Sequence, residues 1–301
     1  MANQTISFLM RRFAEVGIYP KTKHGQNFLI DLNLLNMLAD SAKVEANDVV
    51  LEIGTGTGSL TSRLADRAAA VVTVELDPQM HLLASEELID YSNITMLQMD
   101  ALKNKNTLSE VVLDTVREQL AVDPNRRFIL AANLPYNIAT PILSNLLACD
   151  LTPATMTVTI QKELADRIMA VPCTKDYSSL SVWMQSQCEI ELVRIMSPTV
   201  FWPRPKVHSA ILHITLREEL RDRIHDRAFF HDFVRSMFFH RRKFLRGELL
   251  AALKHKLGKV EVDEIMQTME FGTTTRAEEL DVPTMIRLSE TVKARLDAAA
   301  Q

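Results

Sequence analysis

The chain of 301 residues has few cysteines, few aromatic residues and no long apolar segment. Its three cysteines, Cys149, Cys173 and Cys188, are far apart and show no CxxC spacing, so we expect neither a disulfide framework nor a metal site. No apolar run reaches the roughly 18 residues that cross a bilayer. The arginines of residues 1–17 follow the apolar residues, an order that is wrong for a secretory signal. We expect a globular, monomeric, cytoplasmic protein with no membrane partner.

Positive charge is concentrated in residues 201–256. Residues 201–256 hold 13 Lys and Arg against six Asp and Glu, a net charge of +7, so the rest carries −11 within a total of −4. The total argues mildly against a nucleic-acid partner, but such asymmetry indicates a polyanionic one. A solvated helix face is the alternative interpretation.

Strand-like and helix-like segments alternate between residue 48 and about residue 160. This alternation predicts right-handed parallel crossovers, and the continuous apolar runs predict strands that are buried on both faces. We therefore predict an α/β fold with a doubly wound sheet. Its first five strands are expected within residues 48–54, 69–77, 93–102, 127–134 and 154–161.

The pattern changes in the last third of the chain. Residues 188–196 and 208–216 have the composition of two more strands, and they are separated by the proline-containing segment 197–207. From Glu218 onward every segment has helical spacing. We predict a larger domain over residues 1–217 and a small all-α domain over residues 218–301.

The first strand ends in a glycine loop, "EIGTGTG", that contains Gly54, Gly56 and Gly58. Glycines here let the backbone approach a ligand closely. Glu75 ends the second strand, where a carboxylate would accept hydrogen bonds from ribose hydroxyls. Asp100 ends the third, where it could accept from an adenine amine. The GxGxG spacing differs from the GxGxxG of nicotinamide enzymes. It favours a ligand that contains adenosine but no phosphate, such as S-adenosylmethionine. The alternative is that the glycines only form tight turns and that the two acids only lie on the surface.

The fourth strand ends in the sequence Asn133-Leu134-Pro135-Tyr136. The Asn133 side-chain oxygen and a Leu134 or Pro135 carbonyl can both accept from one amino group, and Tyr136 offers a face on which a base can stack. Two acceptors would aim the lone pair of a poorly nucleophilic adenine N6 at a methyl donor, so positioning and electrostatics supply the catalysis. The alternative is a capping Asn and a core Tyr.

Eight motifs occur in the order that is typical of one family. They are HGQNFLID, LEIGTGTGSLT, VELD, MDAL, NLPYNIATPIL, IQKELADRI, FWPRPKVHSAIL and HRRKFLRGEL. With these motifs the sequence resembles the small-subunit (16S) ribosomal RNA adenine-N6,N6-dimethyltransferases from about residue 21 to its end. The resemblance implies a Rossmann-like S-adenosylmethionine-dependent methyltransferase domain and a helical C-terminal domain that binds rRNA.

The resemblance also implies roles for individual residues. Those expected to hold S-adenosylmethionine are Asn27, Leu29, Gly54, Gly56, Glu75, Asp100 and Asn133. Those expected to act on the target adenine are Asn133, Pro135, Tyr136 and Phe201, the last closing over the base from its other face.

The basic residues of HRRKFLRGEL are expected to contact 16S rRNA within the pre-30S particle. We predict a helix over residues 238–249, in which Arg242 and Arg246 share a face at i,i+4. Phe238, Phe239, Phe244, Leu245 and Leu249 would pack beneath the basic residues Arg241, Arg242, Lys243 and Arg246.

The sequence departs from the family pattern in three places: Thr55 stands in place of the usual proline, QMDAL lacks the common glycine before Asp100, and Trp202 is bulkier than usual. The segment 102–126 is also long. Two alternatives stay open: a 23S rRNA adenine methylase of the antibiotic-resistance type, and a non-catalytic RNA-binding assembly factor. The second predicts loss of the donor-site residues, whereas Glu75, Asp100 and Asn133 are present.

Overall fold

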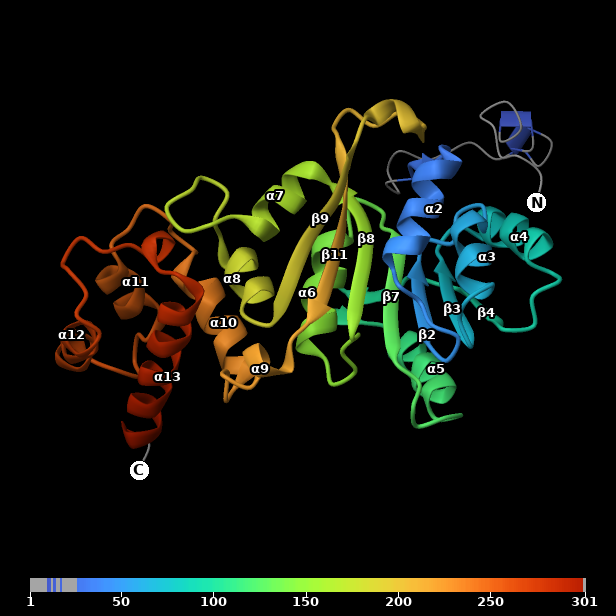
Figure 1. Ribbon diagram of the computed structural model, residues 1–301. Helices are drawn as coiled ribbons and strands as arrows, with labels where there is room; N and C mark the ends of the chain where they lie inside the picture. The colour runs from blue at the N-terminus through green and yellow to red at the C-terminus, as the bar shows by residue number, and fades with distance from the viewer. Residues whose placement is uncertain (1–9, 12, 15–16, 18–25, 300–301) are drawn as a thin grey trace. The chain divides into compact units, whose positions relative to one another are not determined.

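The computed structural model describes residues 10–11, 13–14, 17 and 26–299 (Figure 1). Most of the N-terminal segment assessed for a secretory signal, and the first two residues of HGQNFLID, lie outside this part of the chain. The chain divides into two compact units, residues 1–165 with 190–216, and residues 166–189 with 217–301. The chain passes from one unit to the other three times, and the third passage, between residues 216 and 217, falls next to the boundary predicted after residue 217. The segment 166–189, assigned above to the larger domain, groups with the helical unit instead.

A seven-stranded sheet with the order β4-β3-β2-β7-β8-β11-β9 forms the first unit. The first five of these strands are parallel, and β11 pairs with β8 in antiparallel orientation. All seven predicted strands are present, so the predicted Rossmann-like α/β sheet is confirmed. The strands are β2 (Val49–Ile53), β3 (Ala70–Glu75), β4 (Ile94–Gln98), β7 (Phe128–Asn133), β8 (Thr155–Gln161), β9 (Cys188–Met196) and β11 (Ser209–Leu216).

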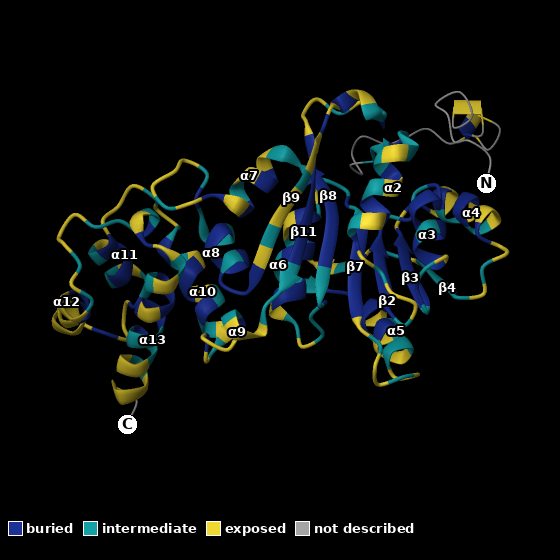
Figure 2. Cartoon of the chain, viewed as in Figure 1, coloured by how far each residue is buried: buried dark blue, intermediate teal, exposed yellow. Residues whose placement is uncertain are grey.

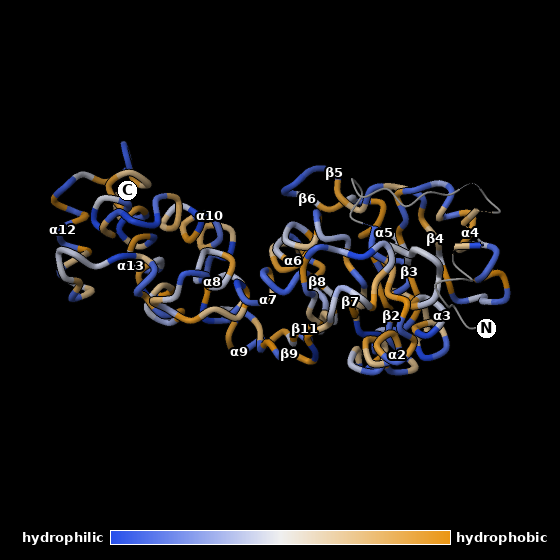
Figure 3. Tube along the Cα trace, turned by 90° about the horizontal axis from the view of Figure 1, so that it is seen from above, coloured by the Kyte–Doolittle hydropathy of each residue, from blue (hydrophilic) through white to orange (hydrophobic). Residues whose placement is uncertain are grey.

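Helices cover both faces of this sheet. Seen from above in Figure 3, α2 (Leu32–Ser41) and α3 (Ser59–Ala65) lie on one side of the strands, and α5 (Glu110–Leu120) and α6 (Ala139–Ala148) lie on the other. β2 and β3 are buried along their whole length, as Figure 2 shows in dark blue. Burial on both faces explains why these strands are mostly Val, Leu, Ile and Ala; their polar residues are Glu52, Thr73 and Glu75.

Two helices of this unit begin at an aspartate that follows a strand. The Asp31 carboxylate accepts from the Asn33 and Leu34 N–H groups at the start of α2. Asp77 does the same at the start of α4 (Pro78–Glu87), where Pro78 fits the first helical position. These caps fix where the chain leaves the sheet edge, and hence where the preceding loops lie.

Short strands account for the segments that link the main elements. β1 (Phe28–Leu29) pairs with β10 (Phe201–Trp202), which follows the 3₁₀ turn η2 (Pro198–Val200). The long segment 102–126 holds a small hairpin, β5 (Leu102–Asn104) and β6 (Thr107–Leu108), followed by α5.

The second unit is helical, as predicted from Glu218 onward. Trp183 and Phe230 are among its largest fully buried side chains. No helix among the described residues is long and apolar enough to cross a membrane. The elements are α7 (Lys162–Met169), which enters this unit, α8 (Ser179–Gln185), α9 (Glu218–Arg221), α10 (Arg227–Met237), α11 (Leu245–Ala252), α12 (Lys259–Thr268), η3 (Ala277–Glu279) and α13 (Val282–Ala299).

Candidate functional site

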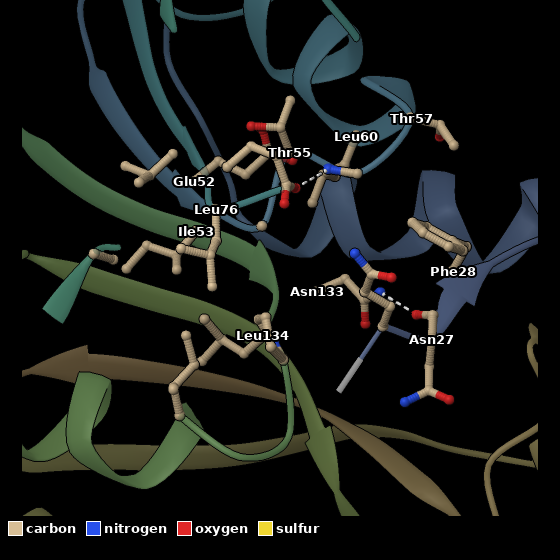
Figure 4. Close-up of a pocket in the computed structure, with 18 of the residues that line it drawn as sticks. Asn27, Phe28, Glu52, Ile53, Thr55, Thr57, Leu60, Leu76, Asn133 and Leu134 are labelled. Atoms are coloured by element: carbon tan, nitrogen blue, oxygen red, sulfur yellow. Dashed lines mark hydrogen bonds between the residues drawn. The ribbon is translucent and has the colours of Figure 1, made fainter. Parts of the chain in front are cut away.

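A pocket opens at the carboxyl ends of β2, β3 and β7 (Figure 4). Leu35 and five chain segments line it; the segments lie within residues 26–29, 52–60, 74–76, 99–101 and 133–138. Ligands of doubly wound sheets bind at this edge. The pocket brings together nine of the ten residues predicted for the donor and the base: Asn27, Leu29, Gly54, Gly56, Glu75, Asp100, Asn133, Pro135 and Tyr136.

The glycine loop has the backbone conformation that its sequence predicts. Gly54 and Gly56 have φ values of +89° and +56°, which side chains rarely tolerate. A Cβ on Gly54 would lie 3.3 Å from Pro135 Cδ, and one on Gly56 would lie 3.3 Å from the Phe28 ring. The absence of side chains therefore lets the loop approach the NLPY segment and β1 closely.

Glu75 lies at the end of β3 and is only 8% exposed. Its Oε2 accepts from the Gly56 N–H at 3.0 Å, and its Oε1 accepts from the Asp77 N–H at 2.9 Å. Burial raises the pKa of this carboxyl, and the two backbone donors oppose that shift. Asp100, by contrast, is exposed at the rim, where its Oδ1 accepts from the Leu102 N–H at 2.9 Å. One carboxylate is thus fixed to the glycine loop and the other faces solvent.

The NLPY segment presents two hydrogen-bond acceptors. Asn133 Nδ2 donates to the Asn27 carbonyl at 2.9 Å, an orientation that leaves Oδ1 as an acceptor (Figure 4). The Pro135 carbonyl accepts from the Ile138 N–H at 3.1 Å, whereas the Leu134 carbonyl has no such partner among the described residues. Of the two carbonyls considered from the sequence, that of Leu134 is therefore the available one.

Tyr136 is anchored through its hydroxyl, which lies 2.5 Å from Ser209 Oγ on β11. Burial raises the pKa of this phenol, so it is neutral at physiological pH. A ring that is held at its far end keeps a fixed orientation on the pocket wall. This arrangement suits a stacking surface and does not suit a general base.

Phe201 is the one predicted base-contacting residue that does not line the pocket. It is 2% exposed and belongs to the hydrophobic cluster that contains Leu29 and Leu35. Its role over a base stays a prediction, and in this conformation its ring is enclosed by the core. The bulky Trp202 next to it lies 6.4 Å from the Phe28 ring, centroid to centroid, in a stacked arrangement.

Sequence reasoning missed Glu52, which lies one residue before the end of β2 and lines the pocket. Its Oε2 accepts from Thr61 Oγ1 at 2.6 Å and from Thr73 Oγ1 at 2.7 Å. Thr73 Oγ1 in turn lies 2.6 Å from Thr55 Oγ1, so the residue that replaces the family proline joins this buried network. An acid within the otherwise apolar run VVLEI was the available signal. Burial raises the pKa of Glu52 to about 8.

Glu52→Gln should change how stability depends on pH. Glu52 holds its proton up to about pH 8 in the folded chain but ionises near 4.5 when unfolded, so wild-type stability falls as pH rises between these values. The difference in free energy of unfolding, wild type minus variant, should fall by up to about 1.4 kcal/mol per pH unit in this window. Urea denaturation at pH 5.5 and 7.5 measures it. A difference that is the same at both values would contradict the protonated state.

The basic residues of HRRKFLRGEL do not lie on one helix, and the predicted helix over 238–249 is wrong. α10 ends at Met237, a turn covers residues 238–244, and α11 begins at Leu245 after the extended Phe244. Arg242 therefore cannot share a helix face with Arg246. The helix breaks because the side chains of this turn are held by other elements.

Three of the four basic side chains already have acidic partners. Arg241 pairs with Glu278 and donates to the Thr174 and Lys175 carbonyls. Arg246 forms a two-point ion pair with Asp263, at 2.5 and 3.0 Å. Lys243 Nζ lies 3.9 Å from Glu248 Oε1. Arg242 is exposed and has no ionic partner among the described residues.

The expected packing of the aromatic residues in this turn is also partly wrong. Leu245 and Leu249 are buried, and Phe238 meets Tyr177 edge-on with centroids 5.9 Å apart. Phe239 and Phe244, however, are 79% and 46% exposed.

No group of three or more His, Cys, Asp or Glu that could hold a metal ion occurs in the described part of the chain.

Comparison with known proteins gives consistent results. The model of a family described as ribosomal RNA adenine dimethylase matches residues 19–292. Ribosomal RNA small subunit methyltransferase A of Listeria innocua is 38% identical over 276 residues, 91% of this chain and 90% of that protein. The protein of the same name from Bacillus pumilus is 36% identical over 277 residues, 92% of each chain.

Two solved structures share the architecture. A dimethyladenosine transferase from Plasmodium falciparum has a TM-score of 0.73 and 23% identity, and the match covers 88% of this chain and 97% of that one. The 23S rRNA methyltransferase ErmE has a TM-score of 0.60 and 25% identity, with 89% and 100% covered.

Proposed function

Because the chain belongs to the ribosomal RNA adenine dimethylase family, we propose that it methylates two adjacent adenines of small-subunit rRNA. It would transfer methyl groups from S-adenosylmethionine to N6 of each adenine in the 3′-terminal hairpin of 16S rRNA, giving N6,N6-dimethyladenosine in the cytoplasm during 30S maturation. The observation that carries this proposal is the pocket in which a glycine loop and the two NLPY acceptors meet.

The donor half of the pocket fits S-adenosylmethionine, whose sulfonium supplies an electrophilic methyl group. Gly54 and Gly56 would admit its amino-acid portion, and Asn27 and Leu29 would contact it from β1. Glu75 would accept from the ribose hydroxyls and Asp100 from the adenine amine. The buried Glu52 is a further polar group in the lining of the pocket. A cationic ligand bound there would favour the ionised form of the Glu52 carboxyl.

The acceptor half fits a flat base with an exocyclic amine. Asn133 Oδ1 and the Leu134 carbonyl would accept the two N6 hydrogens, while the Tyr136 ring would stack on the base. Both acceptors belong to a segment that is held at Asn27, Thr159 and Ser209, so they are oriented before the base arrives. A base inside a helix cannot reach such a pocket, so the target must leave its stack.

Methyl transfer to purified ribosomal subunits tests the function. The protein should transfer tritiated methyl groups from S-adenosylmethionine to unmethylated 30S particles, and nucleoside digestion should yield N6,N6-dimethyladenosine. Transfer to 23S rRNA instead would favour the resistance-type methylase, which shares the fold of ErmE. Particle binding without any transfer would favour a non-catalytic assembly factor.

We propose that the turn between α10 and α11 contributes to rRNA binding, with Arg242 as its free cation. Arg242→Glu should weaken binding to 30S particles at least tenfold, because it replaces one phosphate contact by a repulsive charge. The salt dependence of log Kd should become shallower by about one. Filter binding at several salt concentrations measures both quantities.

Lys259→Glu is the matched control, because it reverses another exposed cation of the same unit. Equal losses of affinity in the two variants would mean that binding follows net charge alone. An unchanged salt dependence in Arg242→Glu would show that Arg242 makes no phosphate contact. Substitution of Arg241 or Arg246 is less informative because each would also break an internal ion pair.

A further inference from the structure

We propose that Phe239 is a stacking surface for an unpaired rRNA base, separate from the base-binding pocket. This inference rests on the proposed function and names the contact that the helical unit makes with its RNA. Phe239 is 79% exposed, the largest exposed fraction of any aromatic side chain in the described residues. A ring this exposed contributes little to the packing of the core.

The turn that carries Phe239 is fastened from several sides. Arg241 is held by Glu278 and by two carbonyls of the segment before α8. His240 Nδ1 lies 3.3 Å from the buried Glu248 carboxylate. The Leu245 N–H donates to the Thr275 carbonyl at 2.7 Å. These contacts hold the backbone that follows Phe239. Before it, the Phe238 ring meets Tyr177, and the Phe239 N–H donates to the Ser236 carbonyl at 3.3 Å, so the ring is held in place without being covered.

The side chains that remain on the outer surface of the turn alternate between aromatic and cationic. Phe239 meets the His240 ring edge-on at 4.9 Å. Arg242 follows as an exposed cation, and the half-exposed Phe244 has the Arg276 guanidinium over its ring at 5.6 Å. The acids that face this turn, Glu248 and Glu278, lie next to its Lys243 and Arg241 side chains.

This combination matches single-stranded RNA better than a protein partner. Aromatic faces stack on bases of any sequence, and neighbouring cations bind the phosphates that join them. A protein partner with an apolar pocket would not require the flanking Arg242 and Arg276. Since a base in a regular helix is already stacked, the ligand must be an unpaired nucleotide in a loop, bulge or end.

Binding of two RNA probes tests the proposal. The first probe is a fluorescein-labelled octauridylate, which contains no adenine and cannot supply the target base. The second is the unmethylated 30S particle. Phe239→Leu keeps an apolar side chain but removes the π face, so affinity for both probes should fall roughly 5- to 100-fold. Phe239→Trp should bind at least as tightly as wild type.

Val260→Ala is the matched control, since Val260 is 69% exposed on α12 of the same unit, and it should bind both probes normally. Wild-type affinity of Phe239→Leu for either probe would overturn the proposal. A loss of affinity for the 30S particle alone would mean that Phe239 contacts a ribosomal protein and not RNA, and it would equally overturn the proposal. Methyl transfer by the wild-type chain is scored separately, so failure of the proposed function is distinguishable from failure of the stacking contact.

Discussion

Asn133→Ala should lower kcat for methyl transfer by about 10²–10³, the usual effect of removing one acceptor that acts on the transition state. The side-chain oxygen is one of only two acceptors that the NLPY segment offers to the N6 amine. Affinity for S-adenosylmethionine should change little, because the other donor-site residues stay in place. Single-turnover transfer to 30S particles and calorimetry of donor binding measure the two effects.

Thermal unfolding must accompany this experiment, because Asn133 Nδ2 also holds the Asn27 carbonyl. Tyr136→Phe is the matched control: it removes the hydroxyl bond to Ser209 but keeps the ring, and it should cost far less activity. If Asn133→Ala kept more than a tenth of wild-type turnover, the amide would be a structural cap and the two-acceptor mechanism would be wrong.

Glu75→Ala should weaken S-adenosylmethionine binding by about 1.5–3 kcal/mol, the range for hydrogen bonds to a charged group. The structure adds a second cause, since Glu75 also accepts from the Gly56 and Asp77 N–H groups and so shapes the loop that receives the donor. Calorimetry with S-adenosylmethionine measures the loss. Glu75→Gln, which keeps one acceptor, should lose less.

Asp100→Ala offers the comparison within the same pocket. Asp100 is exposed and holds only the Leu102 N–H, so its loss should disturb the glycine loop less. Unchanged donor affinity in Glu75→Ala would show that the carboxylate serves the loop alone and that the ribose is held elsewhere.

The sheet and the pocket were largely predictable from the sequence because their signals are local. Continuous apolar runs indicate buried parallel strands, and polar or glycine residues at the ends of those runs must gather at one edge of the sheet. Gly54, Glu75 and Asn133 each follow directly from this rule. The parallel orientation of the first five strands follows from the alternation of helix and strand alone.

The parts that could not be predicted depend on contacts between distant residues. The break at Phe238–Phe244 follows from Arg241 and Leu245 bonding to Glu278 and Thr275, more than 25 positions away, which helical periodicity cannot reveal. Phe201 is enclosed by the cluster around Leu29 for the same reason. The acid within VVLEI was visible in the sequence, but its threonine partners Thr61 and Thr73, which show how it is accommodated, are apparent only in the structure.

The close approach of Gly54 to Pro135 has a consequence for how this protein can vary. One position belongs to the donor loop and the other to the segment that holds the base, yet a single added methyl group would bring them into contact. Substitutions at the two positions should therefore be non-additive: a smaller residue at 135 should relieve the steric part of the cost of Ala at 54 but not the backbone strain that comes from its positive φ. The donor loop and the base-binding segment are therefore sterically coupled, and substitutions in one constrain which substitutions the other tolerates.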